Sequence, residues 1–262
     1  MLQAPPFDLF APGAGSLIAL CGARVSGLLL VAPVFSARMV PPMVKAGLIV
    51  LLTVLMVPVA TAHLPVAPEL TPATVLGETL VGFVIGLGAA LLVGAAEAAG
   101  ELMAIQIGLS GASIMDPVNQ HQVPALGQFM QLTAIALLLG LDLHLVMLDA
   151  VAASTRLLPI GMEMDLAGGA RAMVGLGSTL FLLGLRFAAP VVASVLIANV
   201  ALAVLSRAAP QLNVLSVAFP LQIGVGLFAL AASIPLIATF FTNWSTPYDD
   251  MVGRVLRVLG GG

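Results

Sequence analysis

The sequence has few charged residues, few aromatic residues and only one cysteine. Asp, Glu, Lys and Arg make up 8% of its 262 residues, and hydrophobic residues make up 60%, whereas soluble domains contain about 25% charged residues. This composition excludes a soluble domain and predicts one membrane-associated helical unit. The single Cys21 excludes an internal disulfide and a cysteine metal cluster. A net charge of -3, with scattered basic residues, argues against nucleic acid as a partner.

The sequence motifs of common enzymes are also missing. The chain contains no HExxH, CxxC, GxxxxGK[ST] or GxSxG pattern. Asp142, His144 and Asp149 lie near one another, but positions two apart on a helix point to different sides, so we favour a hydrogen-bonded or interfacial histidine over a metal ligand. We therefore expect no enzyme activity, no cofactor and no metal. No basic region precedes the first apolar run, so we also expect no cleaved signal peptide.

Six apolar runs predict the fold. Each is long enough to cross ~30 Å of hydrocarbon as a helix. Pro33 and Pro190 should end or bend the helices that contain them. We predict an all-α protein with about six long, often kinked hydrophobic helices that form hairpins. The runs cover approximately residues 16–37, 43–62, 72–107, 124–153, 172–205 and 219–241.

The positions of the basic residues do not agree on one orientation of these helices in the membrane. With six spans, the basic turn at Arg38 and Lys45 would lie on the opposite side of the membrane from Arg254 and Arg257 in the tail. The positive-inside rule expects such residues on one side. This conflict indicates that not every run is an ordinary upright span.

The third run carries a stripe of small residues. Every fourth position after Glu78 is small, beginning with Gly82 and Gly86 and continuing through Gly94. Such stripes let helices approach closely in membranes, so we expect helix packing here and no chemical role. Glu97 and Glu101 follow on one face and should avoid lipid.

Two interpretations of the embedded carboxylates remain open. They could pair with Arg24, Arg186 or neighbouring subunits and so fix the packing, or they could relay protons. We favour packing.

Between the third and fourth runs lies a polar segment, residues 106–131, that contains no Lys or Arg. Two prolines and three glycines prevent one uninterrupted helix from crossing it. Its irregular backbone must be wet or enclosed by protein, because hydrocarbon cannot satisfy its N–H and C=O groups. The polar segment is therefore the first candidate for function.

The turn before the last run carries a family resemblance. Residues 206–214 (SRAAPQLNV), followed by AFPLQI at 218–223, closely resemble the turn of the FliR family of flagellar export-gate proteins. Arg24 with APVFSA, Asp116-Pro117 and Arg186-x-x-x-Pro190 fall in the same order as in that family. The resemblance covers nearly the whole chain.

The resemblance implies a non-enzymatic subunit of the flagellar type III export gate, located in the bacterial inner membrane at the flagellar basal body. One copy would assemble with FliP-like and FliQ-like subunits and meet FlhB-type and FlhA-type export proteins, membrane lipid and unfolded flagellar substrates. Residues 1–170, including the polar segment, would resemble a FliP subunit. Residues 171–262 would form a FliQ-like hairpin with a short tail.

The resemblance also implies roles for single residues. A plug for the closed pore would include Gly108, Ser110, Gly111, Met115, Asp116, Pro117, Asn119, Gln120 and His121. We expect Met103 and Met115 to help seal the pore. The positions expected to serve helix packing and assembly are Glu78, Gly82, Gly86, Gly94, Glu97, Glu101, Arg186, Arg207, Pro210, Gln211, Asn213, Phe219 and Pro220.

Two alternatives remain. The first is the homologous export subunit of a virulence injectisome, which the sequence does not separate from a flagellar one. The second is a small proton-coupled secondary transporter that uses Glu97 and Glu101 as ion-coupling groups. A transporter would be active as the purified chain alone, whereas a gate subunit would need its partners.

Overall fold

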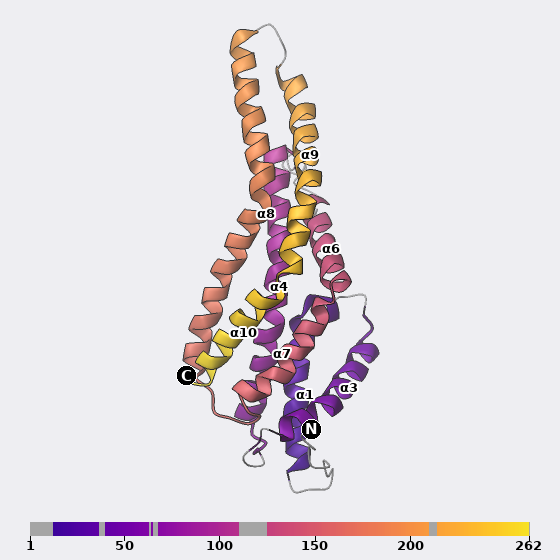
Figure 1. Cartoon of the computed structure of the whole chain (residues 1–262), viewed down its shortest axis with the longest axis vertical. Coiled ribbons are helices and arrows are strands. Elements are labelled where there is room, and N and C mark those ends of the chain that lie inside the picture. The colour runs from indigo at the N-terminus through magenta and orange to yellow at the C-terminus, as the bar shows by residue number, and fades with distance from the viewer. Residues whose placement is uncertain are drawn as a thin grey trace, which may run out of the picture. The chain divides into compact units, whose positions relative to one another are not determined.

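The structure is a computed structural model that describes residues 13–36, 40–62, 64, 68–109, 125–209 and 214–261, and all regular secondary structure in these ranges is helical (Figure 1). The predicted all-α class is confirmed. Five helices are long and apolar enough to cross a membrane, and the bent pair α6 and α7 would make a sixth span if counted as one. The helices are α1 (Ala14–Val31), α2 (Pro33–Ser36), α3 (Pro42–Thr61), α4 (Pro72–Ile107), α6 (Ala125–Gly140), α7 (Leu143–Leu157), α8 (Leu166–Ala208), α9 (Val214–Thr242) and α10 (Ser245–Leu259).

The fourth predicted helix is wrong as one continuous element. The structure has two helices there, α6 and α7, which meet at an angle of 67°. The break falls at Asp142, whose φ of 56° is left-handed. Aspartate tolerates that conformation better than most residues, and Gly140 just before it is a weak helix former. His144 and Asp149 therefore lie on the separate helix α7, and the described residues contain no cluster of three potential metal ligands.

The chain forms two compact units, and α4 and α8 each continue from one unit into the other. Unit 1 comprises residues 1–91, 139–177 and 244–262, and unit 2 comprises residues 92–138 and 178–243. Both units are therefore built from segments that are far apart in the sequence. The predicted division between a FliP-like and a FliQ-like part concerns likeness to other subunits, and it stays a prediction.

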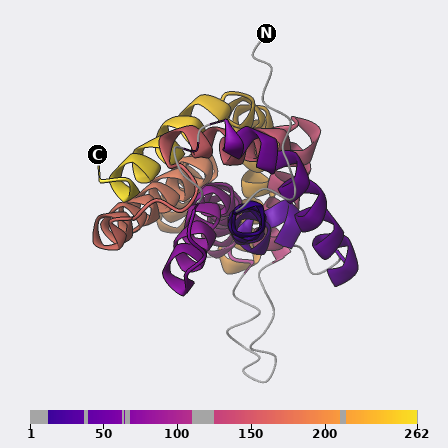
Figure 2. The same ribbon diagram turned by 90° about the horizontal axis from the view of Figure 1, so that it is seen from below.

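Unit 1 packs α1 against α3, α7 and the first part of α4, as Figures 1 and 2 show from two directions. Helix α10 closes this unit by burying one apolar face that includes Val252 and Leu256. The hydroxyl of the buried Tyr248 donates to the carbonyl of Ile85 at 2.8 Å. Burial raises the pKa of Tyr248 above its usual range, so the phenol stays a neutral donor. The short tail predicted from the sequence thus forms part of the core of unit 1.

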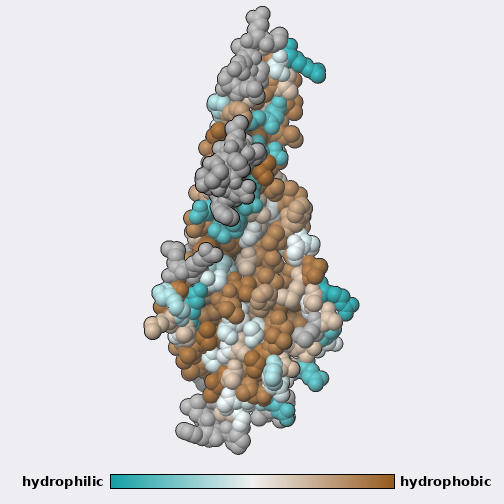
Figure 3. Space-filling view, turned by 180° about the vertical axis from the view of Figure 1, so that it is seen from behind, coloured by the Kyte–Doolittle hydropathy of each residue, from teal (hydrophilic) through white to brown (hydrophobic). Residues whose placement is uncertain are grey.

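Unit 2 contains the hairpin of α8 and α9 together with α6 and the end of α4. The Gln222 amide donates to Asn199 at 2.5 Å, which joins the two arms of the hairpin. Many large apolar side chains remain exposed, among them Phe181 and Ile197 at 71% and Phe228 at 78%. Figure 3 shows that hydrophobic residues dominate the visible face of the molecule. Such a surface suits a protein surrounded by lipid or by other subunits.

Candidate functional site

A buried ion pair joins α1 to α4 in unit 1. The Nε of Arg24 donates to Oε2 of Glu78 across 2.6 Å, and both side chains are completely buried. Arg24 also donates to the Ser154 hydroxyl at 2.9 Å and to the Leu158 carbonyl at 3.0 Å. The other carboxylate oxygen of Glu78 accepts from the amide of Gly161 at 2.8 Å. Buried charges need such partners, so the network holds α1, α4 and the turn after α7 in one arrangement.

Sequence reasoning named Arg24 as one of two arginines that could pair with a carboxylate, but it missed the rest of this network. Leu158 and Gly161 contribute backbone atoms, which leave no side-chain pattern. Gly161 has a φ of 83°, and a Cβ there would lie 2.5 Å from the Cβ of Pro68. A glycine shortly after Pro159 is the one sequence signal that could have marked the turn.

Glycines bring the backbones of α1 and α4 into contact. A Cβ at Gly82 would collide with the carbonyl oxygen of Arg24, and a Cβ at Gly86 would lie 2.9 Å from the carbonyl oxygen of Leu28. Gly27 on α1 is equally confined by the backbone of α4. These residues therefore pack within unit 1. Their expected part in assembly with other subunits stays a prediction.

The second half of α4 packs in unit 2. The carboxylate of Glu97 accepts from the Gln131 amide on α6 at 2.8 Å. A Cβ at Gly127 of α6 would lie 3.0 Å from the Cγ of Glu101, and one at Gly94 would lie 3.5 Å from a methyl group of α8. In the described part of the chain neither carboxylate has an ion-pair partner. The pairing of Glu97 with Gln131 was not predicted.

Helix α4 ends at the start of the polar segment in a Schellman motif. The Leu109 amide donates to the carbonyl of Ala104 at 3.0 Å, and the Gly108 amide donates to that of Ile105 at 3.2 Å. Gly108 has the left-handed φ of 86° that this motif requires. The helix therefore stops at a defined residue.

Gly108 lies beside the start of α9. A Cβ at this glycine would be 3.5 Å from the ring of Phe219 and 3.7 Å from the amide oxygen of Gln222. Unit 2 thus brings together the start of the polar segment and the FPLQ sequence of the turn that carries the family resemblance. Met103, one turn earlier on α4, is fully buried. Its sealing role stays a prediction.

The structure describes only some of the remaining predicted site residues. Arg207, Phe219 and Pro220 are described and exposed, and Arg186 lines a groove in unit 2. The remaining predicted positions lie outside the described residues: Ser110, Gly111, Met115, Asp116, Pro117, Asn119, Gln120, His121, Pro210, Gln211 and Asn213.

Replacing Gly108 with alanine should destabilise the end of α4 by about 1–2 kcal/mol, because a left-handed conformation costs that much for a residue with a Cβ. Asparagine at this position should cost less, since its side chain tolerates the conformation. Chemical denaturation in detergent, followed by circular dichroism, measures the difference. Gly224→Ala is the matched control, because a Cβ there meets nothing within 4 Å. Equal stability of Gly108→Ala and wild type would contradict the assignment.

The sequence matches a known family over most of its length. Residues 16–246 match the family described as "Bacterial export proteins, family 1". The chain is 35% identical to the flagellar biosynthetic protein FliR of Escherichia coli K12, over 90% of this chain and 91% of the relative. It is 34% identical to FliR of Pectobacterium carotovorum, with the same coverage. It is 29% identical to FliR of Bacillus subtilis 168, over 90% of this chain and 93% of the relative.

These matches agree with the structure on the class of protein. The family and its relatives are named for export and for flagellar biosynthesis, and the structure has the long apolar helices of a membrane protein. The match includes the buried ion pair, the Schellman end of α4 and the hairpin of α8 and α9. The chain therefore belongs to the bacterial export proteins, family 1, as a membrane protein of the FliR type.

Proposed function

We propose that this protein is a structural and gating subunit of the flagellar type III export apparatus in the bacterial inner membrane. It forms the export gate together with FliP-like and FliQ-like subunits, and unfolded flagellar proteins pass through that gate. The observation that carries the proposal is the similarity to FliR of E. coli along 90% of the chain. A match of that extent covers every described helix from α1 to α9, so it reaches beyond one shared motif.

The lengths of two helices support an assembled subunit. Helix α8 has 43 residues and α4 has 36, which correspond to about 65 and 54 Å at 1.5 Å per residue. The hydrocarbon core of a bilayer is only about 30 Å thick. Parts of both helices must therefore lie outside the hydrocarbon or be strongly tilted. Packing against other subunits would cover the apolar side chains that these parts expose.

The position of the polar segment supports a plug. A channel for unfolded chains must exclude ions when idle and must open without a strong preference for sequence. The segment begins at the end of α4, lacks Lys and Arg, and contains glycines that allow its backbone to move. A displaceable loop suits this task better than a rigid helix does.

Replacing residues 110–122 with a flexible Gly-Ser linker of equal length tests the plug, while Gly108 and Leu109 remain to close α4. We expect resting cells to become permeable to ions, measured as loss of membrane potential upon expression together with the partner subunits. Recovery of the complex by affinity purification controls for assembly. An assembled complex with this linker that stays as ion-tight as wild type would overturn the plug proposal.

The transporter alternative makes a different prediction about Glu97 and Glu101. For a gate, changing both to glutamine should leave secretion within about a factor of two, because a neutral amide can keep the hydrogen bond to Gln131. For a transporter that couples to protons through these groups, the change should abolish activity. Secretion of a flagellar hook protein and proton uptake into vesicles of purified chain distinguish the two. The injectisome alternative is settled by whether flagellar or effector genes neighbour this gene.

A further inference from the structure

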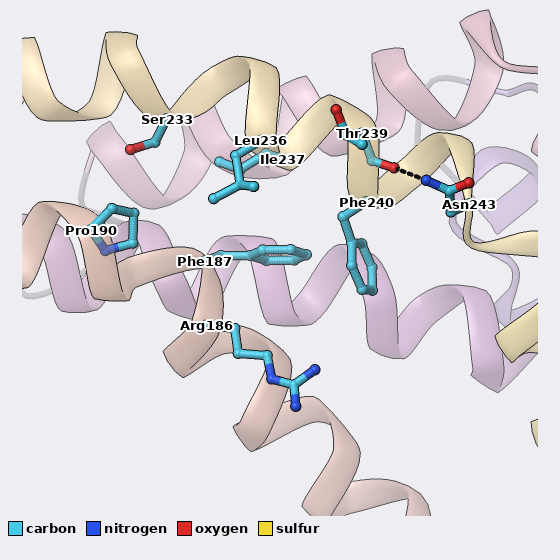
Figure 4. A pocket seen from close by; sticks show the side chains of 9 residues that line it. All are labelled: Arg186, Phe187, Pro190, Ser233, Leu236, Ile237, Thr239, Phe240 and Asn243. Atoms are coloured by element: carbon cyan, nitrogen blue, oxygen red, sulfur yellow. Dashed lines mark hydrogen bonds between the residues drawn. The ribbon is translucent and has the colours of Figure 1, made fainter.

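An apolar groove lies within unit 2 between α8 and the last turns of α9. Its volume is about 370 Å³, which is in the range of small-molecule sites. Figure 4 shows side chains from both helices around it, with the rings of Phe187 and Phe240 side by side. The centroids of these rings are 5.1 Å apart in an edge-to-face arrangement. Pro190, Leu236 and Ile237 form most of the remaining apolar wall.

The hydroxyl and amide groups at the groove already have acceptors. Ser233 donates to the carbonyl of Ala229, one turn earlier on α9, and Thr239 donates in the same way to Pro235. The side-chain amide of Asn243 donates to the carbonyl of Thr239. The two hydroxyl donors are therefore occupied by the backbone of α9, and one N–H of the Asn243 amide is also used. Only Arg186 offers a charged partner to an anionic ligand at this groove.

Arg186 stands at the edge of the groove without a counter-charge. Arg186 is exposed, and no hydrogen bond or ion pair links it to the described residues. Residues 178–243 contain no Asp or Glu, and Glu97 and Glu101 on α4 in the same unit form no ion pair with Arg186. A charge within an apolar helix needs a partner or access to water. The groove therefore combines the N–H donors of Arg186 with an apolar wall, and no described residue supplies the complementary anion.

The position of Arg186 beside the groove suits contact with a phosphate. The contact between Phe187 and Phe240 sets Arg186 beside the last turns of α9, which ends at Thr242. An arginine there can reach a phosphate at the edge of the groove while an acyl chain lies in the groove beside it.

A lipid fits the groove better than a partner helix does. An α-helix with its side chains is about 10–12 Å wide, and close helix packing in membranes uses small residues. This groove is instead lined by bulky Phe187, Leu236 and Phe240, which leave a space suited to a thin hydrocarbon chain. Basic pockets between membrane helices are known to bind phospholipid head groups.

We propose that the groove between α8 and α9 binds an anionic phospholipid, with the lipid phosphate paired to Arg186 and one acyl chain lying against Phe187, Leu236 and Phe240. The site does not depend on the gate role, because it is built wholly within unit 2. Binding here would tie the hairpin to the anionic lipids that surround it.

Native mass spectrometry of the full chain in nonionic detergent tests the site with phosphatidylglycerol and phosphatidylcholine as probes. We expect wild type to retain phosphatidylglycerol at least about tenfold more strongly than phosphatidylcholine, because the choline cation of phosphatidylcholine offsets the charge of its phosphate, whereas phosphatidylglycerol offers Arg186 an uncompensated anion and a charge-assisted hydrogen bond about twice as strong as a neutral one. Arg186→Gln should lose this preference and Arg186→Lys should keep part of it. Arg207→Gln, on the same helix but away from the groove, should behave as wild type.

A second variant keeps the test independent of Arg186. Leu236→Trp should fill the groove and reduce retention of both lipids, while thermal unfolding in detergent reports whether the variant is folded. Equal retention of phosphatidylglycerol by wild type and a folded Arg186→Gln would overturn the proposal. So would a crosslink from position 186 to a carboxylate of a partner subunit in a complex that carries no lipid.

Discussion

Replacing Arg24 with methionine is expected to remove about 3–5 kcal/mol of folding stability, because the change leaves the carboxylate of Glu78 buried without its counter-charge. Arg24 and Glu78 are both completely buried, so water cannot take over as a partner. The hydroxyl of Ser154 and the carbonyl of Leu158 lose their donors in the same variant. Denaturant titration in mild detergent, followed by circular dichroism, measures this loss.

Two further variants separate the effect of charge from that of packing. Arg156→Met removes an exposed arginine from α7 and should change stability little. Combining Arg24→Met with Glu78→Leu should recover part of the loss, because no buried charge then remains. The assignment would be contradicted if Arg24→Met were as stable as wild type, or if the double variant were no more stable than Arg24→Met alone.

Gly82→Val should separate α1 from α4 and cost about 3 kcal/mol or more, the upper range for overpacking a core. The atom in the way is the backbone carbonyl oxygen of Arg24, which cannot turn aside as a flexible side chain can. The helices can accommodate the new side chain only by moving apart, and that movement also strains the adjacent ion pair. Loss of monodisperse protein on size-exclusion chromatography and a lowered denaturation midpoint are the expected results.

The matched control is Gly47→Ala on α3, where a Cβ meets nothing within 4 Å. This change should be neutral or slightly stabilising, because alanine is the better helix former by about 1 kcal/mol. A folded Gly82→Val protein with wild-type stability would show that α1 and α4 do not approach each other as closely as the structure has them.

The sequence predicted the helices well because helix formation depends mainly on the local sequence. Uninterrupted apolar runs fix where a membrane helix can form, so α4 begins and ends where the pattern of residues 72–107 indicates. The exception, at Asp142, depends on one residue adopting a left-handed conformation inside an otherwise apolar run. The hydrophobic pattern of the sequence contains no signal for such a break, and the nearby Gly140 is the only local indication of one.

The candidate site was harder to predict because its contacts join distant parts of the chain. Arg24 and Glu78 are 54 residues apart, and Gly161 reaches Glu78 across 83 residues. The sequence named the two charged side chains as unusual in apolar helices, but it could not say which charge meets which. The left-handed cap at Gly108 was not predicted either, although a glycine at the end of a long helix is a local signal for one.

The most direct test of the account is native mass spectrometry of this chain expressed together with its FliP-like and FliQ-like partners. We expect a defined hetero-oligomer that contains one copy of the chain, and we expect export to be absent when the chain is left out. The Arg24→Met variant should fail to enter that complex, whereas Arg156→Met should enter it as wild type does. A stable homodimer without partners that moves protons by itself would contradict the export-gate function.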